Sequence, residues 1–517
     1  MPVIQQGSIN TTALIVPDLY VQIVPPSVTL LNGVPTNKLG IVGIANWGPV
    51  NSPVVFGNMA DGARAFGVMQ NLTHDLLTAA AAAVLQGANN ICGVRVTDGT
   101  DVAAHVDLMD TTAITPVAGA TATALYTGTL GNKISMGIAV GSAANTHKFT
   151  VALPGGVPEV FDNIPGATAS FWANLVSAVN QGMSGIRGPS QIIKLALGAG
   201  TAAPAVATYT AASGTDGNTT ITDTVLIGDD TTTPRKGMYA LRNTQTSIAF
   251  LAESDDPTHW TYQAAFALSE GIYMVLTGPA SQTIAAFGTA VGTAGVDTYA
   301  VKTLLGDWVY FNDTVNNVTR LISPQGFCAG RLANLSPEQS SLNKPLYGIV
   351  GTQKSAAQQT YSQAELALLA AAMGDVITNP SPGGSFFSMR FGHNASSNAV
   401  TNGDNYTRMT NYIAYMLSAG MGLFVGRLQS KFERLEAKAT IETFLSSMED
   451  KNMIGAVNGG PAFQVILDAS NNPNSRVALG YQQADVKVIY LSIVEKFLIN
   501  VEGGQSVQIS RQSTQTA

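Results

Sequence analysis

The chain has 517 residues, of which Asp, Glu, Lys and Arg make up only 11%, less than half of the roughly 25% found in ordinary soluble domains. The formal net charge is −7, so the chain lacks the basic balance typical of a general nucleic-acid-binding protein. The low charge favours a subunit whose surface is largely covered by neighbours, because a free monomer normally needs more charge to stay soluble.

The length allows about three or four domains of ~150 residues each. No apolar run reaches the ~18 residues of a membrane-spanning helix, and the first residues lack a signal-peptide pattern. Cys92 and Cys328 lie far apart and show no CxxC spacing. We expect them to be reduced, buried thiols, with a disulfide as the alternative, in a protein made in the cytoplasm.

Residues 1–25 are predicted to form an extended N-terminal arm. Within it, residues 12–24 are apolar and β-prone and are interrupted by Pro17. A strand at the end of a chain exposes unpaired N–H and C=O groups, which is a hazard unless another chain completes the pairing. This arm therefore suggests a protein that is linked to copies of itself.

Residues 26–100 and 226–355 show the strand–helix alternation of a parallel α/β domain. Their apolar, β-prone runs predict buried strands, and the longer periodic runs between them predict helices. The predicted strands cover residues 39–45, 91–96, 248–252, 273–277 and 308–311, and the predicted helices cover 60–66, 73–87, 260–269 and 281–291.

Residues 101–225 interrupt this pattern with a segment dominated by Thr, Ala and Gly. Short strand-like runs at 133–140, 148–153 and 159–163, with one helix near 171–180, predict a β-rich inserted domain. Residues 201–224 are predicted to be a surface loop. We expect the insertion to lie on the outside and to be dispensable for the fold of the α/β core.

Residues 356–502 are predicted to form a C-terminal α+β domain, followed by a polar tail over 503–517. Helices are expected at 361–373, 406–417 and 430–455, and a β-rich run at 485–502. The predicted fold class is therefore α/β and α+β multidomain: a discontinuous α/β core with a β-rich insertion, a C-terminal α+β domain and extended arms at both ends.

Catalysis is a natural alternative, because α/β folds often carry enzymes. The sequence contains no GxSxG elbow, P-loop or HExxH motif. His259 lies near Asp255 and Asp256, but these acids stand where a helix start needs capping. The five histidines show no i,i+4 pairing that would indicate a metal site. We expect no enzyme activity, catalytic residues, cofactor or metal, and keep an α/β hydrolase as the alternative from a different class.

One face of the helix predicted over 430–455 is basic. Three basic residues recur there at i, i+3 and i+7, about 100° from an apolar stripe. The basic residues are Lys431, Arg434 and Lys438, and the stripe consists of Phe432, Leu435 and Ala439. The basic face is either solvated and paired with Glu433 and Glu436, or it binds an acidic partner.

Five segments in order resemble the contractile-tail sheath proteins of bacteriophages, and the similarity spans nearly the whole chain. They are PDLYVQI at 17–23, GIVGIANWGPV at 40–50, LYTGTLGNKIS at 125–135, EVFDN at 159–163, and a closing region that includes NMIG at 452–455, AFQV at 462–465 and EKFLINV at 495–501.

The resemblance implies a structural polymer. Such subunits form stacked hexameric rings around a rigid tube, exchange arms with their neighbours, and contract without nucleotide hydrolysis to drive the tube through the bacterial envelope. The implied partners are further copies of the chain, the tail tube protein, and baseplate and tail terminator proteins. The implied location is the virion, after synthesis in the host cytoplasm. The sheath of a related injection device, such as a bacteriocin or secretion system, is the alternative.

The resemblance also gives roles to two sets of residues. Lys431, Arg434 and Lys438 are expected to face an acidic tube. Alternating apolar residues in the two arms are expected to pack in an intersubunit sheet by β-augmentation, because alternate side chains share one strand face. These arm residues are Val21, Ile23, Phe497, Ile499 and Val501.

Overall fold

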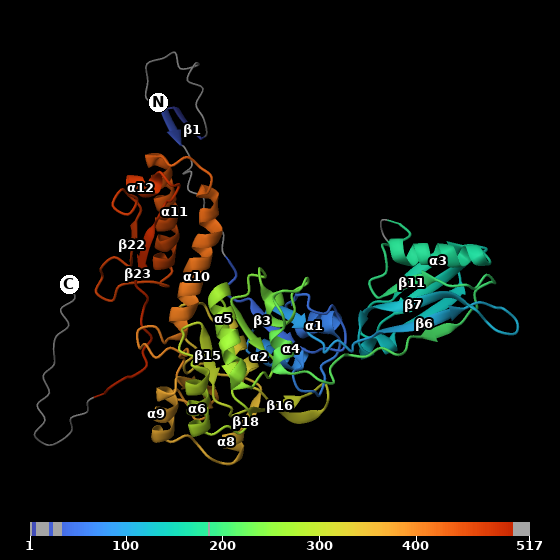
Figure 1. Cartoon of the computed structure of the whole chain (residues 1–517), viewed down its shortest axis with the longest axis horizontal. Coiled ribbons are helices and arrows are strands. Elements are labelled where there is room, and N and C mark those ends of the chain that lie inside the picture. The colour runs from blue at the N-terminus through green and yellow to red at the C-terminus, as the bar shows by residue number, and fades with distance from the viewer. Residues whose placement is uncertain (1–2, 7–19, 24–33, 185–186, 500–517) are drawn as a thin grey trace, which may run out of the picture.

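The computed structural model describes residues 3–6, 20–23, 34–184 and 187–499. An α/β core lies at the centre, an outer lobe (residues 102–215) projects to one side, and a C-terminal lobe (residues 404–490) stands on the other (Figure 1). No helix in the described ranges is long and apolar enough to cross a membrane.

The core contains a seven-stranded sheet whose strands come from two separate parts of the chain. All neighbouring strands are parallel except β4 and β5. In spatial order they are β19 (Gly374–Asp375), β15 (Val301–Leu304), β14 (Tyr273–Thr277), β13 (Ile248–Leu251), β3 (Leu39–Gly43), β5 (Ile91–Arg95) and β4 (Val54–Phe56). The strands predicted at 39–45, 91–96, 248–252 and 273–277 are confirmed.

Helices cover both faces of this sheet, which explains why its central strands are apolar at nearly every position. Along β14, Tyr273 and Val275 face one hydrophobic cluster, while Met274 and Leu276 face the other. One cluster includes α2 (Leu76–Leu85) and α7 (Gln325–Asn334), and the other includes α4 (Asp223–Ile227), α5 (Trp260–Glu270), α6 (Ile284–Ala294) and α9 (Gln363–Ala371).

Smaller elements complete the core. The helix predicted at 60–66 is α1 (Met59–Phe66), and the strand predicted at 308–311 is β16 (Val309–Asp313). β16 lies between β17 (Val318–Ile322) and β18 (Ile349–Thr352), and further short elements include α8 (Gln353–Ala356), β20 (Ile377–Thr378) and β21 (Ser388–Met389).

The α7 helix was not predicted from the sequence, and its packing rests on two glycines. A Cβ at Gly326 would lie 3.0 Å from Ala82 Cβ, and one at Gly330 would lie 2.5 Å from Ala83 Cα. Glycine therefore lets the backbones of α7 and α2 approach closely. Because both glycines lower helix propensity, the same feature that permits the contact hid the helix in the sequence.

Replacing Gly330 with Ala should destabilise the protein by about 1–3 kcal/mol, because the added methyl has no space beside the α2 backbone. Gly292 in α6 is a matched control, since a Cβ there meets nothing within 4 Å. Gly292→Ala should stabilise by up to about 1 kcal/mol through helix propensity. Urea denaturation measures the free energy of unfolding of both variants, which should fall for Gly330→Ala and rise for Gly292→Ala. Equal changes in the two variants would contradict the packing argument.

The outer lobe consists of two sheets around its own hydrophobic cluster. The order β11–β7–β6 forms one sheet and β10–β9–β8–β12 the other, with α3 (Ala169–Gln181) packed against them. The strands are β6 (Ala103–Met109), β7 (Ala118–Thr127), β8 (Ser135–Val140), β9 (Thr146–Ala152), β10 (Glu159–Pro165), β11 (Ile193–Leu197) and β12 (Thr208–Thr210). The loop predicted over 201–224 is wrong in part, because β12 pairs with β8.

The chain enters and leaves the outer lobe side by side. Val102 and Thr215 exchange backbone hydrogen bonds of 3.2 and 3.1 Å. Arg95, which is fully buried, ties this junction to the core, since its guanidinium donates to the backbone oxygens of Gly48, Thr127 and Asp216. The lobe is thus joined to the core at a narrow, hydrogen-bonded neck.

Candidate assembly surface

The C-terminal lobe is built on two long helices, α10 (Asp404–Met421) and α11 (Lys431–Asp450). Ser430 accepts a hydrogen bond from the Glu433 backbone N–H and so caps the start of α11. A two-stranded antiparallel sheet, β22 (Phe463–Ile466) and β23 (Asp485–Val488), packs against them, and α12 (Asn474–Val477) lies in the connection between these strands. No further strand pairs with either edge within the described residues, so both edges have backbone groups available for pairing.

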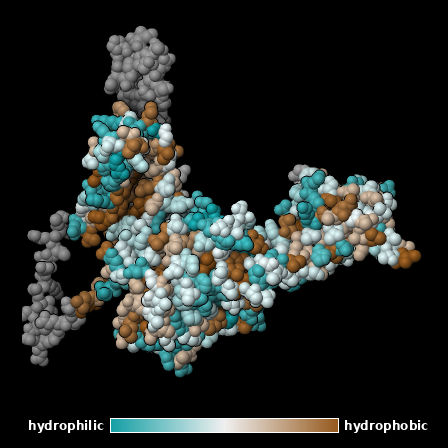
Figure 2. Space-filling model, in the orientation of Figure 1, coloured by the Kyte–Doolittle hydropathy of each residue, from teal (hydrophilic) through white to brown (hydrophobic). Residues whose placement is uncertain are grey.

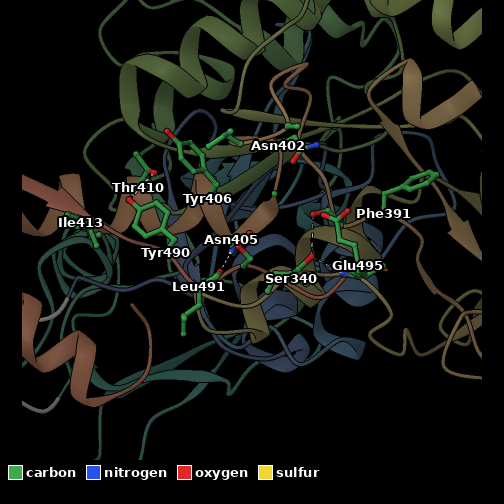
Figure 3. A pocket seen from close by; sticks show the side chains of 18 of the residues that line it. Ser340, Phe391, Asn402, Asn405, Tyr406, Thr410, Ile413, Tyr490, Leu491 and Glu495 are labelled. Atoms are coloured by element: carbon green, nitrogen blue, oxygen red, sulfur yellow. Dashed lines mark hydrogen bonds between the residues drawn. The ribbon is translucent and has the colours of Figure 1, made fainter. Parts of the chain in front are cut away.

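A groove of about 640 Å³ runs between α10 and the C-terminal segment (Figure 3). Val486, Val488 and Tyr490 line it from β23 and the residues that follow, and Tyr406 and Ile413 line it from α10. Alternate residues of β23 therefore face the same hollow. Figure 2 shows apolar surface gathered over β22 and β23, which is the composition expected of a surface that another chain covers.

The strand predicted over 485–502 is wrong in its extent, because β23 ends at Val488. Residues 491–499 form no strand in the single chain. Phe497 and Ile499 are 83% and 68% exposed, and Val501 lies outside the described residues. A strand needs a partner for its backbone groups, and in the described chain none lies beside this segment.

The N-terminal arm contributes two short described strands. β1 (Val3–Gln6) and β2 (Tyr20–Ile23) pair in parallel, with Ile4 opposite Val21 and Gln6 opposite Ile23. Most of the strand predicted over 12–24 lies outside the described residues. The intersubunit role of Val21 and Ile23 remains a prediction.

The three basic residues of α11 have different surroundings. Lys431 is exposed, and Arg434 is half-buried, with its Nε lacking a hydrogen-bond partner in the described part of the chain. Lys438 Nζ lies 3.6 Å from Glu442 Oε1 on the same helix. The partner of Glu433 and Glu436 is Arg427, at 2.7 and 3.5 Å, rather than one of the three predicted residues.

The apolar stripe predicted on this helix is wrong. Phe432 is 83% exposed and Leu435 is 53% exposed. Burial begins at Ala437, because from there the helix packs against α10 and β22. The buried positions are Ala437, Thr440, Ile441, Phe444, Leu445 and Met448. The first turns of α11 therefore present apolar as well as basic side chains to the outside.

Solved structures of contractile sheath proteins have a similar fold over most of this chain. A sheath tail protein from Desulfitobacterium hafniense matches with a TM-score of 0.57 at 16% identity, over 87% of this chain and 93% of that one. A sheath tail protein from Listeria innocua matches with a TM-score of 0.58 at 13% identity, over 89% and 96%. The chain has the fold of contractile sheath proteins.

The same fold occurs in injection devices. The PVC sheath complex of an extracellular contractile injection system, in its contracted state, matches with a TM-score of 0.55 at 10% identity, over 95% of this chain and 98% of that one. No protein-family model and no curated protein sequence matches this chain. The similarity to sheath proteins is thus carried by structure.

The acids near His259 have a structural role within this sheath fold. Asp256 accepts a hydrogen bond from the Thr258 backbone N–H at the helix start, and its Oδ2 lies 3.1 Å from His259 Nδ1. Asp255 is not hydrogen-bonded to His259, and burial raises its pKa. No group of three or more His, Cys, Asp or Glu side chains that could hold a metal occurs in the described ranges.

A buried ion cluster joins the core to the C-terminal lobe and was not predicted from the sequence. Lys302 Nζ lies 2.7 Å from Asp375 Oδ2 and 3.0 Å from Asp404 Oδ1. It also donates to the backbone oxygen of His393 at 2.8 Å. Tyr273 donates its hydroxyl to Asp404 Oδ1 at 2.5 Å. Because Asp404 begins α10, the cluster fixes this helix to β15 and β14.

The cluster stabilises its own charged state. Burial alone would lower the pKa of Lys302, but the two carboxylates outweigh burial and hold this pKa above its ordinary value. Burial would raise the pKa of Asp404, but Lys302 and the hydroxyls of Ser341 and Tyr273 bring it below its ordinary value. In the sequence, the only indication of this buried ion cluster was a lysine within the apolar run over 300–305.

Proposed function

We propose that this chain is the sheath subunit of a contractile phage tail, which polymerises as hexameric rings around the tail tube and contracts to drive it through a bacterial envelope. The observation that carries the proposal is the near full-length match in fold to sheath proteins. On this proposal the protein has no enzyme activity, and its free energy of contraction comes from contacts between subunits.

The C-terminal lobe supports assembly through exchanged strands. Its sheet has available edges, a groove follows β23, and the segment beyond Val488 carries exposed apolar residues. Strand addition satisfies the free backbone groups of both chains. We propose that Val21, Ile23, Phe497, Ile499 and Val501 pack in sheets formed between neighbouring subunits.

The proposed partners are further copies of the chain, the tail tube protein, and baseplate and tail terminator proteins. The proposed location is the phage tail, after synthesis in the host cytoplasm. The sheath of another contractile injection device is the second candidate, because the PVC sheath complex has the same fold. Gene neighbourhood separates these two, since they require different accompanying proteins.

Electron microscopy of the purified chain tests the proposal directly. Rings or tubes with repeating subunits are expected, both alone and in the presence of the tube protein. Stable monomers at all concentrations, together with hydrolytic turnover of ester or amide substrates, would instead support the α/β hydrolase alternative.

Reversing the charges of Lys431, Arg434 and Lys438 to Glu is expected to prevent coating of the tube while leaving tube-free polymers intact. Each exposed ion pair contributes only ~0.2–1 kcal/mol, but the contact repeats in every subunit of the lattice. The attraction acts between opposite charges and should weaken with added salt. Co-sedimentation with tubes and electron microscopy measure the effect.

The matched control replaces three exposed lysines elsewhere with Glu. These are Lys133, Lys194 and Lys236, which have no ion pair in the described structure. This variant carries the same change in net charge and should coat tubes normally. Equal coating by both variants would show that the basic face of α11 is solvated rather than bound to the tube.

A further inference from the structure

Beyond Tyr490, which pairs with Ile454 and contacts Thr410, the C-terminal segment makes two hydrogen-bonded contacts with its own subunit in the described structure. We define residues 491–499 as the strap. Asn405 Nδ2 donates to the Leu491 backbone oxygen at 3.2 Å, and His393 Nε2 lies 2.8 Å from Glu495 Oε1. Figure 3 shows Leu491 beside Asn405, and Glu495 near Phe391. Past Glu495 the side chains of Phe497 and Leu498 are exposed.

The attachment point at His393 is rigid. Its backbone oxygen accepts a hydrogen bond from Lys302 in the buried ion cluster, and its ring stacks on Phe391 with centroids 6.2 Å apart. Glu495 is 40% exposed, so its side of the pair can move into water. The contact therefore joins a fixed group to a segment with little other support.

The strap lies over hollows that it does not fill. The groove beside β23 is on one side, and a second groove of about 580 Å³ is on the other. Ile493 and Glu495 line both grooves. A closed strap thus divides a depression that has room for another segment of extended chain.

The attachment also sets how far the end of the chain can reach. With Glu495 held, Ile499 can lie at most about 14 Å from it, because an extended chain spans about 3.5 Å per residue. With Glu495 released and Leu491 still held by Asn405, the same end can reach about 28 Å from Leu491. A neighbouring subunit that lies beyond the shorter distance is accessible only to the open strap.

We propose that the His393–Glu495 contact is a clip that holds the strap closed in the free subunit and that its release permits assembly. This inference rests on the proposed function as a polymerising subunit and assigns a regulatory step to it. The closed strap shortens the reach of the chain end and partitions the grooves. The open strap extends to a second copy of the chain.

The first test is Glu495→Gln, which removes the charge of the clip while keeping its size. Hydrogen exchange of the amides of residues 492–496 in the monomer should become about two- to five-fold faster, the range expected for loss of a partly exposed side-chain contact. The lag before polymerisation should shorten. Glu449→Gln is the control, since Glu449 is exposed and has no ion pair in the described structure, and it should change neither quantity.

The second test locks the strap. The double substitution His393→Cys with Glu495→Cys, joined by a reducible thiol-to-thiol crosslinker, should prevent tube formation until the linker is cleaved. Cys92 and Cys328 are buried and do not compete for the reagent. A crosslinked subunit that polymerises as fast as the uncrosslinked one would overturn the proposal. Unchanged hydrogen exchange in Glu495→Gln would also overturn it.

The outcomes separate this inference from the proposed function. If the unmodified chain polymerises but both tests show no effect, the strap is not a clip and the sheath function stands. If the unmodified chain does not polymerise under any condition, both proposals fail.

Discussion

A chain that lacks residues 1–24 is expected to remain folded but to form no long tubes. The described strands in this segment, β1 and β2, pair with each other and with no strand of the core, so their loss leaves the core intact. The polymer, however, loses every contact that an exchanged N-terminal arm makes with a neighbour. Sedimentation velocity should show monomers, and circular dichroism should show unchanged unfolding.

Point substitutions sharpen this test, because alternate side chains of a strand face opposite sides. Val21→Asp with Ile23→Asp places two charges on the face expected to pack against a neighbour and should abolish tubes. Gln22→Asp, on the opposite face, should leave them. Normal polymerisation of the deletion variant would contradict arm exchange, and equal effects of the two sets of substitutions would contradict the assigned face.

Replacing Lys302 with Met should destabilise the protein by about 3–5 kcal/mol, the typical cost of removing one partner from a buried ion pair. The reason is that Asp375 and Asp404 remain buried without the cation that compensates them. The loss should appear in urea denaturation as a lower midpoint. The C-terminal lobe should also become more mobile against the core, because Asp404 begins α10.

Lys438→Met is the matched control for this prediction. Its ion pair with Glu442 is partly exposed, so its loss should cost at most about 1 kcal/mol. Adding Asp404→Asn to Lys302→Met should cost less than the sum of the two single changes, since both act on one cluster. A loss below 1 kcal/mol for Lys302→Met alone would show that the cluster contributes little to stability.

The central parallel strands could be predicted because they are buried on both faces and so consist of uninterrupted apolar runs, as at β3 and β14. The α7 helix could not, because glycines that permit close helix packing also weaken the helical pattern. For α11, the helix was predicted, but its buried face was not. Which face is buried depends on where α10 and β22 lie, and that information is not local to the helix.

Like the fold, the candidate assembly surface could be predicted only in part. The sequence singled out the two ends of the chain and the basic face of α11, and their roles stay predictions. It did not reveal the groove, which arises between α10 and β23, or the His393–Glu495 contact, whose partners are 102 residues apart. Lys302 was equally hidden, because its two carboxylates lie far along the chain and a single lysine gives no indication of its partners.

The narrow neck of the outer lobe has a consequence for engineering. Since Val102 and Thr215 exchange backbone hydrogen bonds, removing the residues between them leaves two chain ends that a short turn can join. Loop-closure entropy depends on the distance and length to be bridged, and here both are small. A foreign domain whose own termini lie close together could therefore replace the lobe, and a regular polymer of such subunits would display it at every lattice point.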